Sequence, residues 1–101
     1  MLIFNTTYLV DSQKISLWLE WVKNVHIPFM LKTGKFSAPQ IAKVLYSDSA
    51  NGESFSVQFK VKDMDALGVW SELYAEKFQN DVTEQFGAEV LPFSTVLEIL
   101  E

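Results

Sequence analysis

The sequence predicts one α+β domain over residues 1–101, with four strands and two helices in the order β-α-β-β-α-β. Three observations support this fold class. Apolar and polar residues alternate in the strand segments, and apolar residues recur at spacings of three and four in two helical segments. Short polar side chains and glycines mark the helix ends. With 49% hydrophobic and 14% aromatic residues, the chain can build one core.

The first strand is predicted over residues 2–10, because apolar and polar side chains separate onto two faces there. The apolar face would carry Leu2, Phe4, Thr6, Tyr8 and Val10. The mixed face would carry Ile3, Asn5, Thr7 and Leu9. This contrast predicts a sheet that is covered on both sides, with water excluded from the apolar face but not from the mixed face.

The first helix would follow an N-cap at Asp11 or Ser12, whose side-chain oxygen can accept from free amides of the first turn. Its apolar stripe is Ile15, Trp18, Leu19, Val22, His26, Phe29 and Met30. Pro28 removes one amide and disfavours helical geometry at Ile27. We therefore expect a kink or break at that point, and a last turn that ends at Gly34.

The second strand is predicted over residues 41–46, after a loose run over residues 36–39. The connector over residues 47–52 ends in Asn51-Gly52, a hairpin signal because both residues tolerate positive φ. The third strand alternates cleanly. Its core face would be Phe55, Val57, Phe59 and Val61, opposite Ser54, Ser56, Gln58 and Lys60.

The second helix would begin at the N-cap Asp63, carry Asp65 in its first turn and end at Gly87. Its buried stripe is Leu67, Trp70, Tyr74, Phe78, Val82 and Phe86. The fourth strand is predicted over residues 90–100. One face would carry Leu91, Phe93, Leu97 and Ile99, and the other Pro92, Ser94, Val96 and Glu98. We place Ser94 and Val96 on the sheet face away from the helices.

Proline placement predicts the order of the strands. Proline cannot donate to a strand ladder, so it is confined to edge strands, strand starts and bulges. Pro39 and Pro92 fall in the second and fourth strand regions, and the other two strands have none. The sequence therefore predicts a ferredoxin-like antiparallel sheet of order 4-1-3-2, with both helices on one face.

Composition excludes several classes of function. Cysteine is absent and His26 is the one histidine, so we expect neither a metal site nor a disulfide. The net charge is -5 and the basic residues do not cluster, which argues against nucleic acid and anionic membranes as partners. We find no phosphate-binding loop and expect no cofactor. Without a basic segment before the apolar N-terminus or an apolar run of ~20 residues, we expect a cytoplasmic protein.

Residues 21–28 (WVKNVHIP) followed by residues 33–36 (TGKF) resemble a small bacterial family of unknown function. Strands like residues 3–7 and 93–98 extend the resemblance over nearly the whole chain. The chain also resembles the wider superfamily of dimeric α+β barrels, which includes cofactor-free oxygenases, isomerases and haem-processing enzymes. This resemblance implies a homodimer joined through the open sheet faces, with the helices outside.

The residues are compatible with that homodimer. The predicted open face holds Ile3, Asn5, Thr7, Leu9, Ser56, Gln58, Ser94 and Val96. A mixed face with aliphatic side chains suits a partly hydrated interface between copies. An ordinary solvated sheet face is the alternative.

His26 is the candidate catalytic residue, as a general base or hydrogen-bond donor in a pocket between helix and sheet. Asn5, Tyr8, Trp18 and Trp21 are the candidate ligand-binding residues around it. A structural His26 that bonds backbone carbonyls near Pro28, and a Trp18 that packs in the core, are the simpler interpretations and the ones we favour. Trp21 lies off the stripe and could cover a helix flank, contact a partner or rim a pocket.

Two functions of different classes remain. We favour a non-catalytic dimeric domain that can bind a small molecule between helix and sheet. The alternative is a cofactor-independent small oxygenase or isomerase that uses His26. The five carboxylates of the second helix and its end give no acid–base pair, because nothing predicts that they are desolvated.

Overall fold

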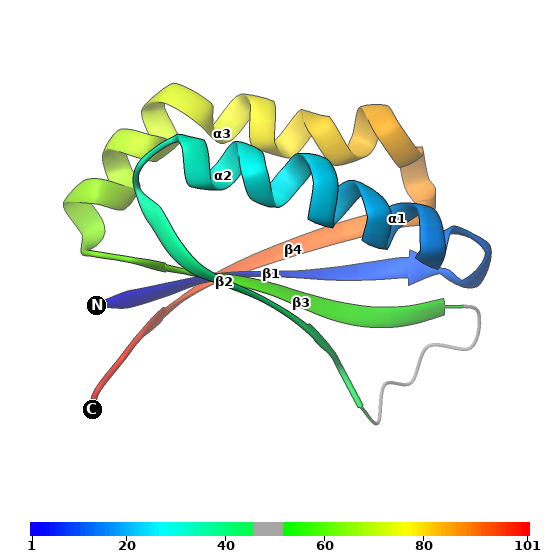
Figure 1. The fold of residues 1–101 in the computed structure, drawn as a ribbon, viewed down its shortest axis with the longest axis horizontal. Coiled ribbons are helices and arrows are strands. Elements are labelled where there is room, and N and C mark those ends of the chain that lie inside the picture. The colour runs from blue at the N-terminus through cyan, green and yellow to red at the C-terminus, as the bar shows by residue number, and fades with distance from the viewer. Residues whose placement is uncertain (46–51) are drawn as a thin grey trace.

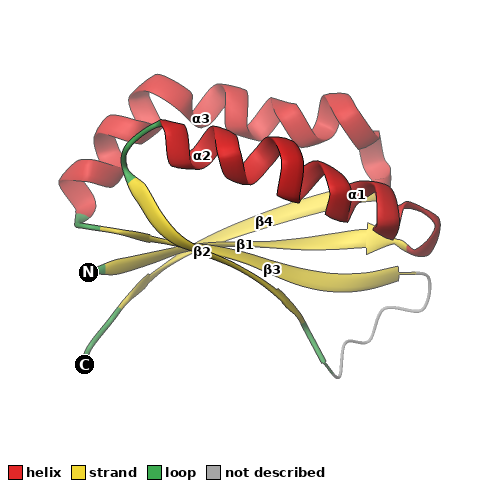
Figure 2. Cartoon of the chain, viewed as in Figure 1, coloured by secondary structure: helices red, strands yellow, loops and turns green. Residues whose placement is uncertain are grey.

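The protein is described by a computed structural model over residues 1–45 and 52–101. A four-stranded antiparallel sheet has the order β2-β3-β1-β4, and the helices lie on one of its faces (Figures 1 and 2). This is the predicted ferredoxin-like order 4-1-3-2 counted from the other edge, so the predicted fold is confirmed.

The two central strands, β1 (Leu2–Asp11) and β3 (Gly52–Val61), pair along their whole length. Phe4 lies opposite Phe59 and Tyr8 opposite Phe55. Because paired residues share a face, these rings all point toward the helices, where they are buried. The predicted core faces of both strands are confirmed.

The first helical segment starts with a 3-10 turn (Ser12–Lys14), for which the carboxylate of Asp11 accepts from the amide of Gln13 at 2.9 Å. It continues as α1 (Ile15–Trp21), a π-helical turn (Val22–His26) and α2 (Ile27–Lys32). Gly34 follows with a φ of 79°. Asp11 is thus confirmed as the predicted N-cap.

The predicted break at Ile27 is wrong, because that residue is helical, with φ -60° and ψ -47°. The irregularity lies one turn earlier. The amide of Ile27 donates to the carbonyl of Val22, five residues back, which marks a turn one residue wider than an α-helical turn. Pro28 then stands in the first turn of α2, where a proline is tolerated. The helical segment therefore continues through Ile27 and Pro28, with one wide turn before them.

The strand β2 (Phe36–Lys43) begins five residues before the predicted start, so the loose run over residues 36–39 was wrongly predicted. Its register shifts between Ser37 and Gln40, and Ala38 has a φ of 49°. This irregularity lets Pro39 stand in an edge strand that pairs on both sides of it. Tyr46 and the predicted hairpin turn up to Asn51 lie outside the described residues.

The long helix α3 (Met64–Phe86) has the predicted ends. The carboxylate of Asp63 accepts from the amide of Ala66 at 2.9 Å, and Gly87 follows the helix with a φ of 62°. A 3-10 turn (Gly87–Glu89) leads into β4 (Val90–Glu98), which ends two residues earlier than predicted.

The predicted faces of β4 are wrong. Leu91, Phe93 and Leu97 lie opposite Leu9, Thr7 and Ile3 of β1, and therefore point away from the helices. Ser94 and Val96 lie on the helix side, opposite Thr6 and Phe4. The first residue of the strand decides this, because Val90 is buried opposite Val10 and every second residue after it shares its face.

Among the described residues, no helix combines the length and the apolar character that crossing a membrane requires.

Candidate functional site

His26 lies at the end of the π-helical turn, and only 3% of its surface is exposed. Its ring stacks on Trp21, with centroids 5.1 Å apart and an interplanar angle of 17°. Phe78, Phe59 and Tyr8 surround it at centroid distances of 5.6, 6.1 and 6.4 Å. The wide turn thus places the imidazole inside a cluster of aromatic rings.

The His26 side chain is neutral at physiological pH. Burial lowers its pKa to about 4, and the nearby carboxylate of Asp81 only partly opposes that effect. Within the described part of the chain, Nε2 of His26 is buried without a hydrogen-bond partner, as are Nε1 of Trp18 and of Trp70. A neutral imidazole with a free nitrogen can act as a base or a donor, provided that a ligand reaches it.

The other predicted site residues do not gather around His26 in one pocket. Trp18 is fully buried and packs against Tyr8, with ring centroids 5.2 Å apart. Trp21 is half-buried and lines a groove of about 360 Å³ between α1 and the end of α3. Asn5 points to the sheet face away from the helices, as its strand parity predicts.

A cleft of about 310 Å³ lies between α3 and the β1–β4 side of the sheet. Its lining consists of Tyr8, Phe78, Gln79, Val82, Pro92 and Ser94. Apart from Tyr8, none of these was predicted as a site residue. Periodicity marks them as core or surface positions of separate elements, so only the packing of α3 over β4 could reveal the cleft.

The hydroxyl groups of Tyr8, Thr6 and Ser94 form a connected set. Thr6 Oγ1 and Ser94 Oγ are hydrogen-bonded at 2.9 Å, and Thr6 also hydrogen-bonds the side chain of Tyr8. Burial raises the pKa of the Tyr8 phenol far above its usual value, more than the bond to Thr6 lowers it. Tyr8 is therefore a neutral phenol at the base of the cleft.

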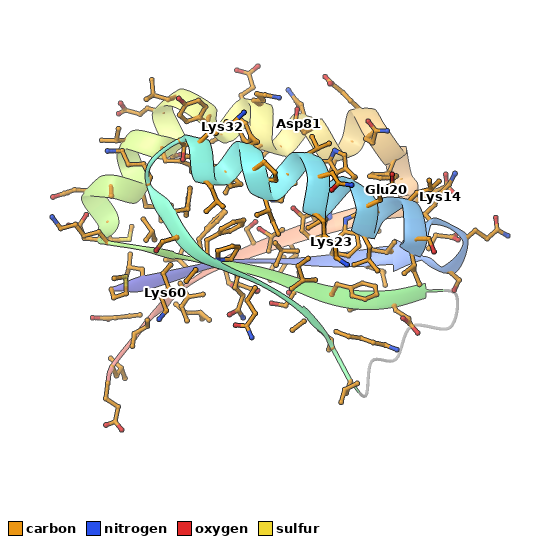
Figure 3. All side chains as sticks on the ribbon, viewed as in Figure 1. Lys14, Glu20, Lys23, Lys32, Lys60 and Asp81 are labelled. Atoms are coloured by element: carbon orange, nitrogen blue, oxygen red, sulfur yellow. The ribbon has the colours of Figure 1, made fainter. Side chains whose placement is uncertain are left out.

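We call the sheet surface away from the helices the open face. Its described residues are Ser37, Gln40 and Ala42 of β2, Gly52, Ser54, Ser56, Gln58 and Lys60 of β3, Ile3, Asn5, Thr7, Leu9 and Asp11 of β1, and Leu91, Phe93, Thr95 and Leu97 of β4. Lys60 and Asp11, the last residue of β1, are the charged residues in this described set. Figure 3 shows Lys60 at the sheet, whereas the other labelled charged residues, among them Lys32 and Asp81, lie on the helical side.

A hydrogen-bonded cluster lies at the middle of the open face. The amide nitrogen of Asn5 donates to the hydroxyls of Thr7 and Thr95, each at 3.3 Å, and its oxygen accepts from the hydroxyl of Ser56. The cluster joins β3, β1 and β4 side by side. In the described residues, no group of three or more His, Cys, Asp or Glu side chains is arranged to hold a metal ion.

The chain belongs to the family described as a domain of unknown function, DUF4286, which matches residues 1–100. A search of the curated proteins found no match.

Solved structures share the fold at low sequence identity. HapK from Hahella chejuensis has a TM-score of 0.71 at 14% identity, over 99% of this chain and 93% of that one. A dimeric ferredoxin-like protein from an uncultured marine organism has a TM-score of 0.71 at 15% identity, over 99% and 96%. A Deinococcus radiodurans protein, provisionally described as an antibiotic biosynthesis monooxygenase, has a TM-score of 0.69 at 14% identity, over 100% and 94%.

Proposed function

We propose that this protein is a homodimeric, non-catalytic domain that joins two copies through their open faces and binds a small molecule between its helices and its sheet. The observation that carries the proposal is the exposure of large apolar side chains on the open face. Phe93 is 68% exposed, Leu91 53% and Leu97 45%. A contiguous apolar surface of this kind is typical of an interface.

The distribution of charge supports the same interface. Charged residues make up 21% of the chain, yet among the described residues of the open face they are limited to Lys60 and to Asp11 at the end of β1. Interface cores are depleted in charged residues, because burying an unpaired charge is costly. A sheet face exposed to solvent would carry more charged residues.

The polar cluster of the open face is compatible with burial. Both donor hydrogens of the Asn5 amide and its oxygen already have partners within the same protomer. Buried polar groups cost little when their hydrogen bonds are made internally. A second copy could therefore cover Asn5 without supplying a partner for it.

The shape of the sheet also fits a second copy. The end of β2 and the C-terminal end of the chain curve away from the helices, so that the open face lies between two projecting ends (Figure 1). Structural neighbours that are described as dimeric ferredoxin-like proteins support a homodimer for this fold. The setting we propose, a bacterial cytoplasm, rests on the sequence alone.

The homodimer is tested by sedimentation velocity at micromolar concentration. We expect the wild-type protein to sediment as a species of twice the chain mass of 11.5 kDa. The variant Phe93→Lys should sediment as a monomer with an unchanged far-UV circular dichroism spectrum, because the new charge lies on the open face.

Leu73→Lys is the matched control. Leu73 lies on α3 and is 67% exposed, which is close to the value for Phe93, but it lies on the opposite side of the molecule. This variant should remain dimeric. A wild-type protein that sediments only at 11.5 kDa, or a Leu73→Lys variant that dissociates like Phe93→Lys, would contradict the proposed interface.

The second candidate function is a cofactor-independent small oxygenase or isomerase that uses His26 as its base. The free, neutral Nε2 of His26 favours it. The ring ¹⁵N chemical shifts of His26 provide the test. The enzyme hypothesis requires a ligand that contacts the imidazole. It fails if small-molecule probes saturate the cleft and leave the ring ¹⁵N shifts of His26 unchanged.

A further inference from the structure

We infer that the ligand site is the cleft between α3 and β4, and that it takes an uncharged, mainly apolar molecule with one hydrogen-bonding end. This inference rests on the small-molecule part of the proposed function and specifies its place and chemistry. It does not depend on dimerisation, because every residue that lines the cleft comes from one protomer.

The walls of the cleft are apolar. Phe78 and Val82 are one turn apart on α3, and Pro92 faces them from β4. A volume of about 310 Å³ is at the lower end of the range for small-molecule sites. The size and the walls suit a single aromatic ring or a short branched aliphatic body.

The polar end is built by the sheet. Ser94 lies in the cleft and is held by its hydrogen bond to Thr6, which in turn bonds Tyr8. Each hydroxyl group has two acceptor lone pairs and one donor hydrogen, so Ser94 retains capacity for a further partner. Gln79 adds an amide at the mouth, and in the described part of the chain this amide makes no hydrogen bond.

The charge of the ligand follows from its surroundings. None of the residues that line the cleft carries a charge. On α3, Lys77 and Asp81 pair with each other at 2.9 Å, which leaves neither as a free counter-ion. An ion that entered the cleft would lose hydration without gaining an opposite charge. The cleft should therefore select against both carboxylates and ammonium groups.

Behind the cleft lies His26. Tyr8 and Phe78 line the cleft on one side and contact the imidazole ring on the other, at centroid distances of 6.4 and 5.6 Å. These two rings separate a bound molecule from the free Nε2 of His26. The site consequently binds a ligand without exposing the buried base unless one of the two rings turns.

The test is an NMR titration of the ¹⁵N-labelled protein with three probes of similar size: phenol, benzoate and benzylammonium. Phenol should produce saturable shifts at the amides of Gln79, Val82 and Ser94, and the two ions should bind at least tenfold more weakly. The substitution Ser94→Val should weaken phenol binding by about tenfold, because it removes the hydroxyl and keeps a residue suited to a strand.

Ser37→Val is the matched control, since Ser37 is an exposed serine on the opposite edge strand, β2. It should leave phenol binding unchanged. Gln79→Ala gives a second measurement on an exposed helix residue, and it should weaken phenol binding by a few-fold. The monomeric variant Phe93→Lys should bind phenol as the wild type does. Sedimentation therefore tests the proposed interface, and phenol titration tests the proposed ligand site separately.

Three results would overturn the inference. One is the absence of saturable phenol shifts at the cleft, or shifts confined to the groove beside Trp21. Another is benzoate or benzylammonium binding as well as phenol does. The third is equal weakening of phenol binding by Ser94→Val and by the control Ser37→Val.

Discussion

Acidification should destabilise this protein through one buried side chain, the imidazole of His26. The unfolded chain carries an ordinary histidine with a pKa of 6.5, whereas burial lowers the pKa in the folded state to about 4. Between these values the unfolded chain binds a proton that the folded chain does not. The contribution of His26 to the free energy of unfolding is therefore fully present above pH 6.5. It is lost progressively as the pH falls toward 4, because protonation then favours the unfolded chain.

The magnitude follows from the same two values. A pKa difference of one corresponds to 1.36 kcal/mol, so the gap between 6.5 and about 4 amounts to about 3 kcal/mol of unfolding free energy. At pH 5, which lies between the two pKa values, the free energy of unfolding should be lower by about 2 kcal/mol. A domain of this size is typically stable by about 5–15 kcal/mol, so the effect is large enough to measure.

The assay is urea unfolding at pH 7.5 and pH 5, followed by tryptophan fluorescence at one protein concentration, because association would change the apparent stability. Carboxylates also contribute to the acid response, so the His26→Phe variant is the reference. Since His26 is the one histidine of the chain, the wild type should lose about 2 kcal/mol more than the variant over this interval. Equal losses in the two proteins would refute a buried, neutral His26.

Two further predictions concern backbone positions. Gly52→Ala should destabilise the protein by about 2 kcal/mol in urea unfolding, because the new Cβ would collide with the carbonyl oxygen of Val10. Its control, Gly68→Ala, meets no atom within 4 Å inside α3 and should stabilise the protein by roughly 1 kcal/mol; a loss in both variants would refute the packing argument. Asp63→Ala should cost about 1 kcal/mol by removing the acceptor for the Ala66 amide, and an unchanged denaturation midpoint would argue against the cap.

The predictable part of the fold was the part governed by local chemistry. The alternation in β3 and the termination of α3 by Asp63 and Gly87 depend on residues close together in the chain, and both were predicted correctly. The two proline-bearing strand regions also identified the edges of the sheet. The early start of β2 was missed, because its pairing across the irregularity near Pro39 depends on β3 rather than on local propensity.

The candidate site was less predictable. His26 and Tyr8 lie in contact, as their placement on facing apolar surfaces suggested, but the π-helical turn that positions the imidazole has no sequence signal that we recognised. The roles of Asn5, Tyr8, Trp18, Trp21 and His26 in binding or catalysis stay predictions. Ser94 of the cleft was assigned to the other sheet face, so its partnership with Thr6 could not be foreseen.

By itself, the sequence determined the number and order of the elements, the core faces of β1 and β3 and the edge positions of β2 and β4. Hydrophobic periodicity and the missing amide of proline operate within a segment and need no tertiary context. Only the tertiary structure decided which side of β4 faces the helices, since both sides carry apolar residues and a shift of one residue exchanges them. In this orientation of β4, Leu91, Phe93 and Leu97 lie on the open face and Ser94 lies in the cleft. Both proposed binding surfaces therefore depend on it.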